Sequence, residues 1–352
     1  MSDTVVHLTK EEKGDEMYRL LVSLCGLMLA GCTQPPLKPV DGNFAVSSHK
    51  LSKPYSDSYK DGLFHMACTD SYKNGHFYST LRNKECSDDQ CIKDRVELAR
   101  SHFEHAAMAN NVYKTPQTKP TFAVPGWTLV SRLSSESGLD VDVYLDAKDW
   151  GSSKKATVVY RGTDFYSLKD WKTNFAISEP LQFKQAFDHL YDIRNNYPSI
   201  PIVVVGHSLG GAIALNMAAR FQNVEAVAFN PSPRAFFAAD RYSKLNKKTI
   251  LYERGEVLDV LFGPYLRMRL EGPIELGNYN LFDYKLRSLP PVQEHGIYEM
   301  TRALTVIAMT VGDDEQARRF FVENVPESVA KEIDWENCAS LYSTANRNTI
   351  TE

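Results

Sequence analysis

The sequence has no apolar run close to the roughly 20 residues that a membrane-spanning helix needs. It has no excess of positive charge, because 40 Lys and Arg residues face 44 Asp and Glu residues, and this argues against a nucleic-acid-binding protein. Six cysteines among 352 residues are few for a disulfide scaffold. No internal repeat and no glycine-rich phosphate or dinucleotide loop is visible. His102 and His105 lie three positions apart, but no acid or thiol completes a metal-binding set, so we expect neither a metal nor another cofactor.

The composition suits a globular protein with a sizeable core, since 43% of the residues are hydrophobic and 24% are charged. The run 201–205 is continuously apolar, which is typical of a parallel strand that is buried on both faces. Strands are expected at 127–130, 141–145, 156–160, 201–205, 225–229, 248–252 and, more weakly, 279–286, and helices at 94–113, 181–196, 211–221 and 296–311. This alternation predicts an α/β protein with a mostly parallel central sheet flanked by helices on both faces.

The longest apolar segment, Leu20–Gly31, has twelve residues and is typical of the hydrophobic region of a signal peptide. It ends in Leu29-Ala30-Gly31-Cys32, which resembles the lipobox of bacterial lipoproteins. The resemblance implies cleavage after Gly31 and a lipid on Cys32. Because Thr33 follows rather than Asp, it also implies a lipid-anchored protein of the bacterial cell envelope, held at the outer membrane.

Two neighbouring features bear on this signal. The residues up to Gly31 carry three basic and five acidic side chains, whereas a start at Met17 leaves Met-Tyr-Arg, a more usual positive beginning. We therefore infer a start at Met17 rather than Met1. The alternative is a buried helix of a cytosolic protein, but Gln34-Pro35-Pro36 follows at once and would break such a helix.

Export would place the mature chain in an oxidising compartment, where disulfides persist. Four cysteines other than the lipidated one remain there and allow three pairings: Cys68, Cys86, Cys91 and Cys338. Cys86 and Cys91 bracket the turn-forming sequence Ser-Asp-Asp-Gln, which favours a local disulfide and leaves Cys68 with Cys338. Free thiols are the alternative, because spacing alone does not determine geometry.

The strand at 201–205 runs directly into Gly206-His207-Ser208-Leu209-Gly210, which a helix follows. This is the G-x-S-x-G pattern in the strand–turn–helix context in which a serine becomes a nucleophile. The turn holds the serine at positive φ, so the residues two positions before and after it must lack bulk, and both are glycines. Ser208 is therefore the predicted nucleophile. His207 is interpreted as structural, because its side chain must point away from the turn.

A second motif, Ala156-Thr-Val-Val-Tyr-Arg161-Gly162-Thr163-Asp164, lies about 45 residues before the serine motif. Together with Asp170-Trp171, Asn174 and the sequence GHSLGGA, it resembles the class 3, or fungal-type, lipase family. The helix end Ala109-Asn-Asn-Val-Tyr113 is also similar to that family's N-terminal helix. The likeness covers about 99–304 and implies an α/β-hydrolase fold with a Ser–Asp–His triad.

Acyl transfer needs a base beside the serine and an acid that orients the base. In α/β hydrolases these follow the serine in the order acid, then histidine, and His295 is the only histidine after Ser208. The acid is expected just after the strand 248–252. Alignment with the family by Gly255 places Glu256 at this position, although the family usually has Asp there, and Asp259 is the competitor.

The oxyanion of the tetrahedral intermediate needs hydrogen-bond donors near the serine. The first is the backbone N–H of Leu209, the residue after the nucleophile, at the start of the helix. The second, by resemblance to the family, is Thr163 of the Arg161-Gly162-Thr163 motif. The predicted active site therefore combines two segments that lie far apart in the chain.

These observations predict a signal peptide at 1–31, a tether and N-terminal cap at 32–90, an α/β-hydrolase (lipase) domain at 91–339 and a polar tail at 340–352. The predicted activity is that of a membrane-anchored serine hydrolase that cleaves carboxylic esters of lipids, as a phospholipase, lysophospholipase or acylglycerol lipase. The lipid substrate and the membrane are then its expected partners, without nucleic acid. Two alternatives stay open: a catalytically idle envelope lipoprotein that binds lipid or protein, and an acyltransferase with the same triad.

Overall fold

The computed structural model describes residues 37–39, 89–113, 121–162, 181–232, 245–253, 274–279, 296–310 and 312–324. All of them belong to one compact unit, Leu37–Glu352. Among these described residues, no helix is both long enough and apolar enough to cross a membrane. The predicted signal peptide, most of the predicted tether and cap, and the predicted tail lie outside the described residues.

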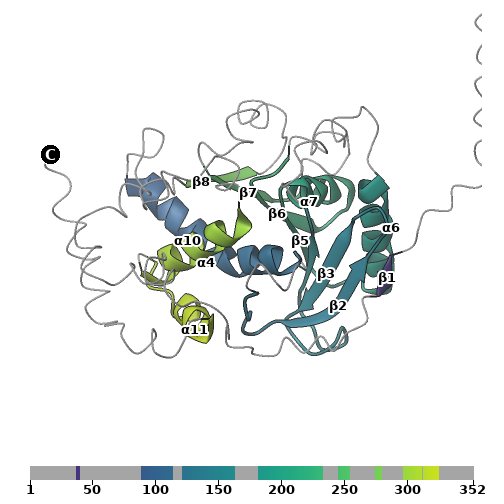
Figure 1. The fold of residues 1–352 in the computed structure, drawn as a ribbon, viewed down its shortest axis with the longest axis horizontal. Coiled ribbons are helices and arrows are strands. Elements are labelled where there is room, and N and C mark those ends of the chain that lie inside the picture. The colour runs from purple at the N-terminus through teal and green to yellow at the C-terminus, as the bar shows by residue number, and fades with distance from the viewer. Residues whose placement is uncertain are drawn as a thin grey trace, which may run out of the picture. The chain divides into compact units, whose positions relative to one another are not determined.

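A single eight-stranded sheet forms the centre of the unit, and its strands are ordered as they occur in the sequence (Figure 1). The strands are β1 (Lys38–Pro39), β2 (Thr128–Ser134), β3 (Asp140–Leu145), β4 (Ala156–Tyr160), β5 (Ile202–His207), β6 (Val224–Phe229), β7 (Lys248–Glu253) and β8 (Ile274–Tyr279). The first four pair antiparallel, and β4 to β8 pair parallel. The sheet is thus mostly parallel, as the sequence predicts.

Helices cover both faces of this sheet (Figure 1). They are α4 (Asp89–Asn111), α6 (Leu181–Asn196), α7 (Leu209–Arg220), α10 (Ile297–Thr310) and α11 (Glu315–Asn324). The helices α6 and α7 pack on one face, while α4, α10 and α11 pack on the other, where α10 runs against α4. The prediction of an α/β-hydrolase fold, with helices on both faces of a mostly parallel sheet, is confirmed.

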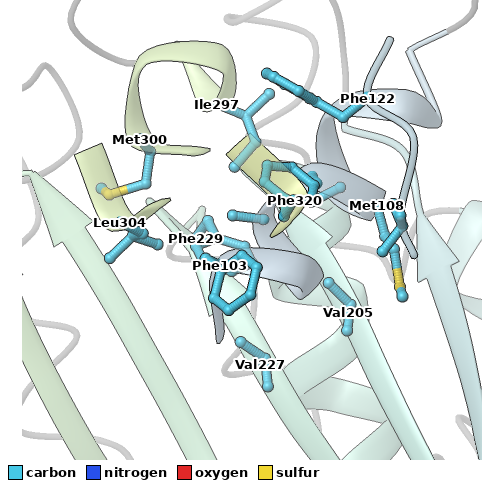
Figure 2. Close-up of a cluster of buried hydrophobic side chains, with 14 of the residues drawn as sticks. Phe103, Met108, Phe122, Val205, Val227, Phe229, Ile297, Met300, Leu304 and Phe320 are labelled. Carbon is cyan, nitrogen blue, oxygen red and sulfur yellow. The ribbon is translucent and has the colours of Figure 1, made fainter. Parts of the chain in front are cut away.

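The alternation of side chains along the strands creates two separate cores. In β5, Val204 faces the core under α6 and α7, whereas Val205 faces the core under α4 and α10. Figure 2 shows this second core, in which Val205 and Phe229 of the sheet face aromatic residues of the helices. The Phe103 and Phe320 rings meet edge to face at 5.4 Å and join α4 to α11.

Most predicted elements agree with the structure to within a few residues, and β4 and α6 have the predicted bounds. The strand β8 at Ile274–Tyr279, which pairs with β7, was not predicted, and all but the first residue of the strand expected at 279–286 lie outside the described residues. The alternating pattern of β8 is short and includes Gly277, which makes its signal weak. The sequence reading also missed α11, although its buried residues follow a helical period: Ala317, Phe320, Phe321 and Asn324.

The edge strand β1 lies within the segment that the sequence reading assigned to the tether and cap. Lys38 pairs with Ser134, and Pro39 pairs with Leu133 of β2. Two residues with one proline carry little strand signal, so only the tertiary structure reveals this pairing. The unit that contains the hydrolase domain therefore begins at Leu37.

Candidate functional site

The site is built around Ser208, which forms the turn between β5 and α7. Its backbone has φ 58° and ψ −123°, a conformation that L-residues rarely adopt. Three backbone hydrogen bonds hold it there. The Ser208 N–H donates to the carbonyl oxygen of Phe229 at 3.0 Å, and its own carbonyl accepts from the N–H groups of Ser232 at 2.9 Å and Ala212 at 3.1 Å. This is the strained turn that the G-x-S-x-G motif predicts.

The glycines of the motif are required by the close approach of three backbone segments. A Cβ on Gly206 would overlap the carbonyl group of Gly210. A Cβ on Gly210 would overlap the carbonyl oxygen of Tyr160, at the end of β4. The start of α7 therefore lies directly against both strands, and side chains at these two positions would push the serine out of its turn.

Ser208 also occupies the N-cap position of α7, yet its hydroxyl makes no capping hydrogen bond. An N-cap serine hydroxyl usually stabilises its helix by such a bond, whereas the Ser208 hydroxyl does not. The backbone N–H of Leu209 opens the helix, where the first N–H groups lack intrahelical partners and the helix dipole is positive. The local electrostatics thus favour negative charge beside the serine.

The Arg161-Gly162-Thr163 motif reaches this turn from the end of β4. A Cβ on Gly162 would come within 2.5 Å of the carbonyl oxygen of His207 and 3.1 Å of the Ser208 Cβ. Only a glycine allows this approach. Thr163, the predicted second oxyanion donor, follows at once but lies outside the described residues, so its role stays a prediction.

His207, which is interpreted as structural, makes a buried side-chain contact with Tyr113. Its Nδ1 lies 2.8 Å from the hydroxyl oxygen of Tyr113, just beyond the end of α4, and the two rings meet edge to face at 5.7 Å. Both side chains are buried. The sequence reading quoted Tyr113 only as part of a family-like helix end and missed this contact, because nothing local relates residues 94 positions apart.

Arg161 ties the same motif to the sheet, which is a second contact that the sequence reading missed. Its Nη1 donates to the Asp140 Oδ2 at 2.6 Å, and its backbone N–H donates to the Asp140 carbonyl oxygen at 3.0 Å. The guanidinium also lies over the Tyr113 ring, 5.6 Å from its centre. Arg161, Tyr113 and His207 thus form one chain of side-chain contacts, and its last member directly precedes Ser208.

The segments expected to carry the acid and the base begin near the same edge of the sheet. Glu253, the last residue of β7, donates its N–H to the Asn230 Oδ1 at 2.7 Å, and Asn230 follows β6. The carboxyl end of β7 therefore lies beside that of β6, next to β5 and its serine. Glu256 and Asp259 follow within six positions of Glu253, but both lie outside the described residues.

The start of α10, two positions after His295, lies near the end of α4. The Phe122 ring stacks on Tyr298 at 5.5 Å, and the Phe122 N–H donates to the Asn111 Oδ1 at 2.8 Å. Asn111 precedes Tyr113 by two residues, and Tyr113 contacts His207. His295 itself lies outside the described residues, so its role as the base stays a prediction.

The remaining predicted residues are mostly outside the described part of the chain: Cys32, Cys68, Cys86 and Cys338. Cys91, near the start of α4, is disulfide-bonded. Its pairing with Cys86 and the pairing of Cys68 with Cys338 stay predictions.

His102 and His105 form a part-buried pair on α4. Their Nδ1 atoms lie 3.1 Å apart, which requires one to donate and the other to accept. Burial lowers the pKa of His102 to about 2, helped by the neighbouring His105, and lowers the pKa of His105 to about 4. Within the described ranges, no group of three His, Cys, Asp or Glu side chains is placed to hold a metal ion.

Comparison with known proteins places this site in a recognised domain. Residues 104–235 match the family described as Phospholipase-like, Tle-like phospholipase domain, and the match includes both the Arg161-Gly162-Thr163 motif and Ser208. The segment that carries both predicted motifs therefore resembles a phospholipase-like domain. No curated protein matches the chain by sequence.

Among solved structures, the lipase from Rhizopus microsporus var. chinensis is 15% identical, with a TM-score of 0.38, over 56% of this chain and 86% of that one. The Rhizomucor miehei lipase propeptide complex is 17% identical, with a TM-score of 0.33, over 50% of this chain and 64% of that one. The Lip2 lipase from Yarrowia lipolytica is 18% identical, with a TM-score of 0.33, over 54% of this chain and 80% of that one.

Proposed function

We propose that this chain, which carries a phospholipase-like domain over residues 104–235 and resembles the fungal-type lipases, is a serine hydrolase that cleaves carboxylic esters of membrane lipids. One observation carries the proposal: Ser208 sits at φ 58° between β5 and the N-terminus of α7, with its hydroxyl not used as a helix cap. A serine in this turn presents its oxygen to a substrate beside the N–H of Leu209. A structural turn has no need for such strain.

The reaction follows from the roles assigned to the residues. The Ser208 oxygen attacks the ester carbonyl while His295 accepts the hydroxyl proton, and the carbonyl oxygen becomes an oxyanion held by Leu209 and Thr163. His295 then protonates the leaving alcohol as the C–O bond breaks. A water molecule, deprotonated by His295, attacks the acyl-enzyme and releases the fatty acid. Glu256 orients the imidazole and stabilises its positive charge.

The lipid anchor at Cys32 is part of the proposal, because it would hold the enzyme at a surface made of its substrates. A triacylated cysteine holds a protein to a membrane far more firmly than one acyl chain does. Membrane fractionation of the wild type and of Cys32→Ser tests this. If Cys32→Ser stays in the membrane fraction, the anchor is not at this cysteine.

Hydrolysis is tested with the full chain and Ser208→Ala on a medium-chain p-nitrophenyl ester and on phospholipid vesicles. The wild type should release free fatty acid from both, and Ser208→Ala should lose at least 10³-fold in kcat. A wild type as inert as Ser208→Ala would establish the idle, lipid-binding alternative. Transfer of the acyl group to an added alcohol in preference to water would establish the acyltransferase.

The identity of the triad acid is tested by comparing Glu256→Gln with Asp259→Asn. Because the acid fixes the tautomer of the base, its neutral analogue should lower kcat by about 10⁴-fold. We expect this loss for Glu256→Gln and a near-normal rate for Asp259→Asn. The reverse result would assign the role to Asp259.

A further inference from the structure

The chain enters the sheet at the edge where the nucleophile lies. β1 is antiparallel to β2, with Lys38 opposite Ser134 and Pro39 opposite Leu133. Ser134 in turn lies opposite Asp140, the first residue of β3. Because β1 runs from the Ser134 end of β2 toward its interior, the start of β1, with Leu37 just before it, lies at the Ser134 end.

That end of the sheet is the active-site edge. Asp140 bonds Arg161 just past the carboxyl end of β4, and β4 is parallel to β5, which ends at His207, next to Ser208. From β1 to β5 there are four strand-to-strand steps, or about 19 Å at the usual spacing of about 4.8 Å. The point of entry and the nucleophile thus share one edge of the sheet and are separated sideways by about 19 Å.

The entry point is held in place by packing as well as by pairing. Leu37 packs against the hydrophobic core on the side of α6 and α7. Lys38 forms an exposed ion pair with Glu136 at 3.3 Å, in the turn between β2 and β3. The ion pair itself contributes little free energy, but Leu37 and the two strand pairs make residues 37–39 part of the folded unit.

Between the predicted lipid-bearing Cys32 and Leu37 there are only four residues, Thr33-Gln34-Pro35-Pro36. Five peptide steps span at most about 17 Å to 18 Å even when fully extended. The link between the predicted lipid and the folded unit is therefore far shorter than the segment 32–90 that was predicted as tether and cap.

We propose that this short link holds the active-site edge of the hydrolase domain against the same bilayer that carries the anchor, so that the enzyme acts in cis on the lipids of its own membrane. The inference rests on the proposed anchor at Cys32 and specifies the partner surface of the proposed hydrolase. A link of this length on the opposite edge of the sheet would instead turn Ser208 away from the membrane.

Orientation is tested without any catalysis, in the lipidated Ser208→Ala protein reconstituted in vesicles of phosphatidylethanolamine and phosphatidylglycerol. A fluorophore is attached at Glu136→Cys, in the turn at the active-site edge, or at Lys154→Cys, in the exposed loop at the opposite edge. Both sites are exposed, and the unsubstituted protein carried through the same labelling gives the background. Energy transfer to a dye in the bilayer should be clearly stronger from position 136. Equal transfer, or stronger transfer from position 154, overturns the proposal.

The consequence for activity is tested by lengthening the link with 40 Gly and Ser residues inserted between Gln34 and Pro35. The wild type should hydrolyse labelled phospholipid in its own vesicles at least tenfold faster than the same lipid in separate vesicles. The insertion should lower this preference severalfold, because the effective concentration of the site at its own membrane falls with linker length. It should leave hydrolysis of a soluble p-nitrophenyl ester unchanged.

The outcomes separate this inference from the proposed function. Absence of ester hydrolysis by the wild type contradicts the hydrolase, while the energy-transfer result still decides the orientation. Normal hydrolysis with no preference for the host vesicles, or with a preference that the insertion does not alter, contradicts the cis arrangement. Equal membrane binding of Cys32→Ser contradicts the anchor, and the inference with it.

Discussion

The hydroxyl oxygen of Tyr113 lies 2.8 Å from Nδ1 of His207, the residue that precedes the nucleophile. This contact joins the end of α4 to the turn at the end of β5. The contact holds the His207 ring toward α4, and Ser208 follows His207 directly in the chain. A helix at the start of the domain thereby helps to position a turn 94 residues later.

Tyr113→Phe should test this positioning role. Removal of the hydroxyl leaves a buried imidazole nitrogen with one partner fewer, which should lower the free energy of unfolding by about 1–2 kcal/mol. We expect kcat for a soluble ester to fall about tenfold with little change in KM, because the turn rather than substrate binding is affected. Urea unfolding and steady-state kinetics measure the two effects. Tyr191→Phe, at an exposed tyrosine on α6, is the control and should change neither.

Gly206→Ala should be among the most damaging single substitutions in the domain. Its new Cβ would collide with the backbone of Gly210, which has no flexible side chain that could move aside. We expect a loss of at least 3 kcal/mol in the free energy of unfolding, or no soluble protein, by analogy with overpacking of a rigid core. Thermal unfolding measures it. Gly151→Ala is the matched control, because its Cβ would meet only the Asp149 carboxylate at 3.4 Å, and a change beyond 0.5 kcal/mol there would weaken the steric argument.

The Asp140–Arg161 ion pair should matter more than an exposed pair nearby. Asp140 is buried, and Asp140→Asn weakens a charge-assisted bond of 2.6 Å while leaving Arg161 partly buried. We expect a loss of about 2–3 kcal/mol in stability and a fall in kcat, because Arg161 lies two positions before Thr163, the predicted second oxyanion donor. Glu136→Gln removes the exposed partner of Lys38 and should cost less than about 0.5 kcal/mol. Equal losses for both variants would contradict the assigned role.

His189 should make the protein less stable in mild acid. Burial lowers its pKa to about 4, from about 6.5 in an unfolded chain. As the pH falls below 6.5 the unfolded chain takes up the proton first, so the free energy of unfolding falls until the pH reaches about 4. His189→Gln should therefore reduce the slope between pH 6 and pH 4.5 by up to one proton, or about 1.4 kcal/mol per pH unit.

Urea unfolding at several pH values between 7 and 4.5 measures this slope for the wild type and for His189→Gln. Asn195→Ala, at an exposed position of the same helix that carries no titratable group, is the control for altering α6 and should leave the slope unchanged. An unchanged slope in His189→Gln would mean that the folded protein takes up this proton as readily as the unfolded chain.

Local features of the sequence were sufficient to predict most of the helices and strands. The apolar run of β5 and the helical period of α6 predict these elements because each signal is complete within one element. The edge strands β1 and β8 were not predicted, since their pairing depends on a neighbour strand rather than on their own short patterns. For α11, the helical spacing of Ala317, Phe320 and Phe321 was readable in the sequence.

By itself, the sequence determined the turn at Ser208 and predicted that this serine is the nucleophile. Gly206, Ser208 and Gly210 lie within five consecutive residues, and the steric demand of a tight turn acts over the few bonds that the motif spans. Only the tertiary structure decided which side chains contact this turn and at which edge of the sheet the strand β1 begins. The Tyr113–His207 contact and the entry of Lys38 at the active-site edge join residues far apart in the chain, so they depend on the packing of helices and the order of strands.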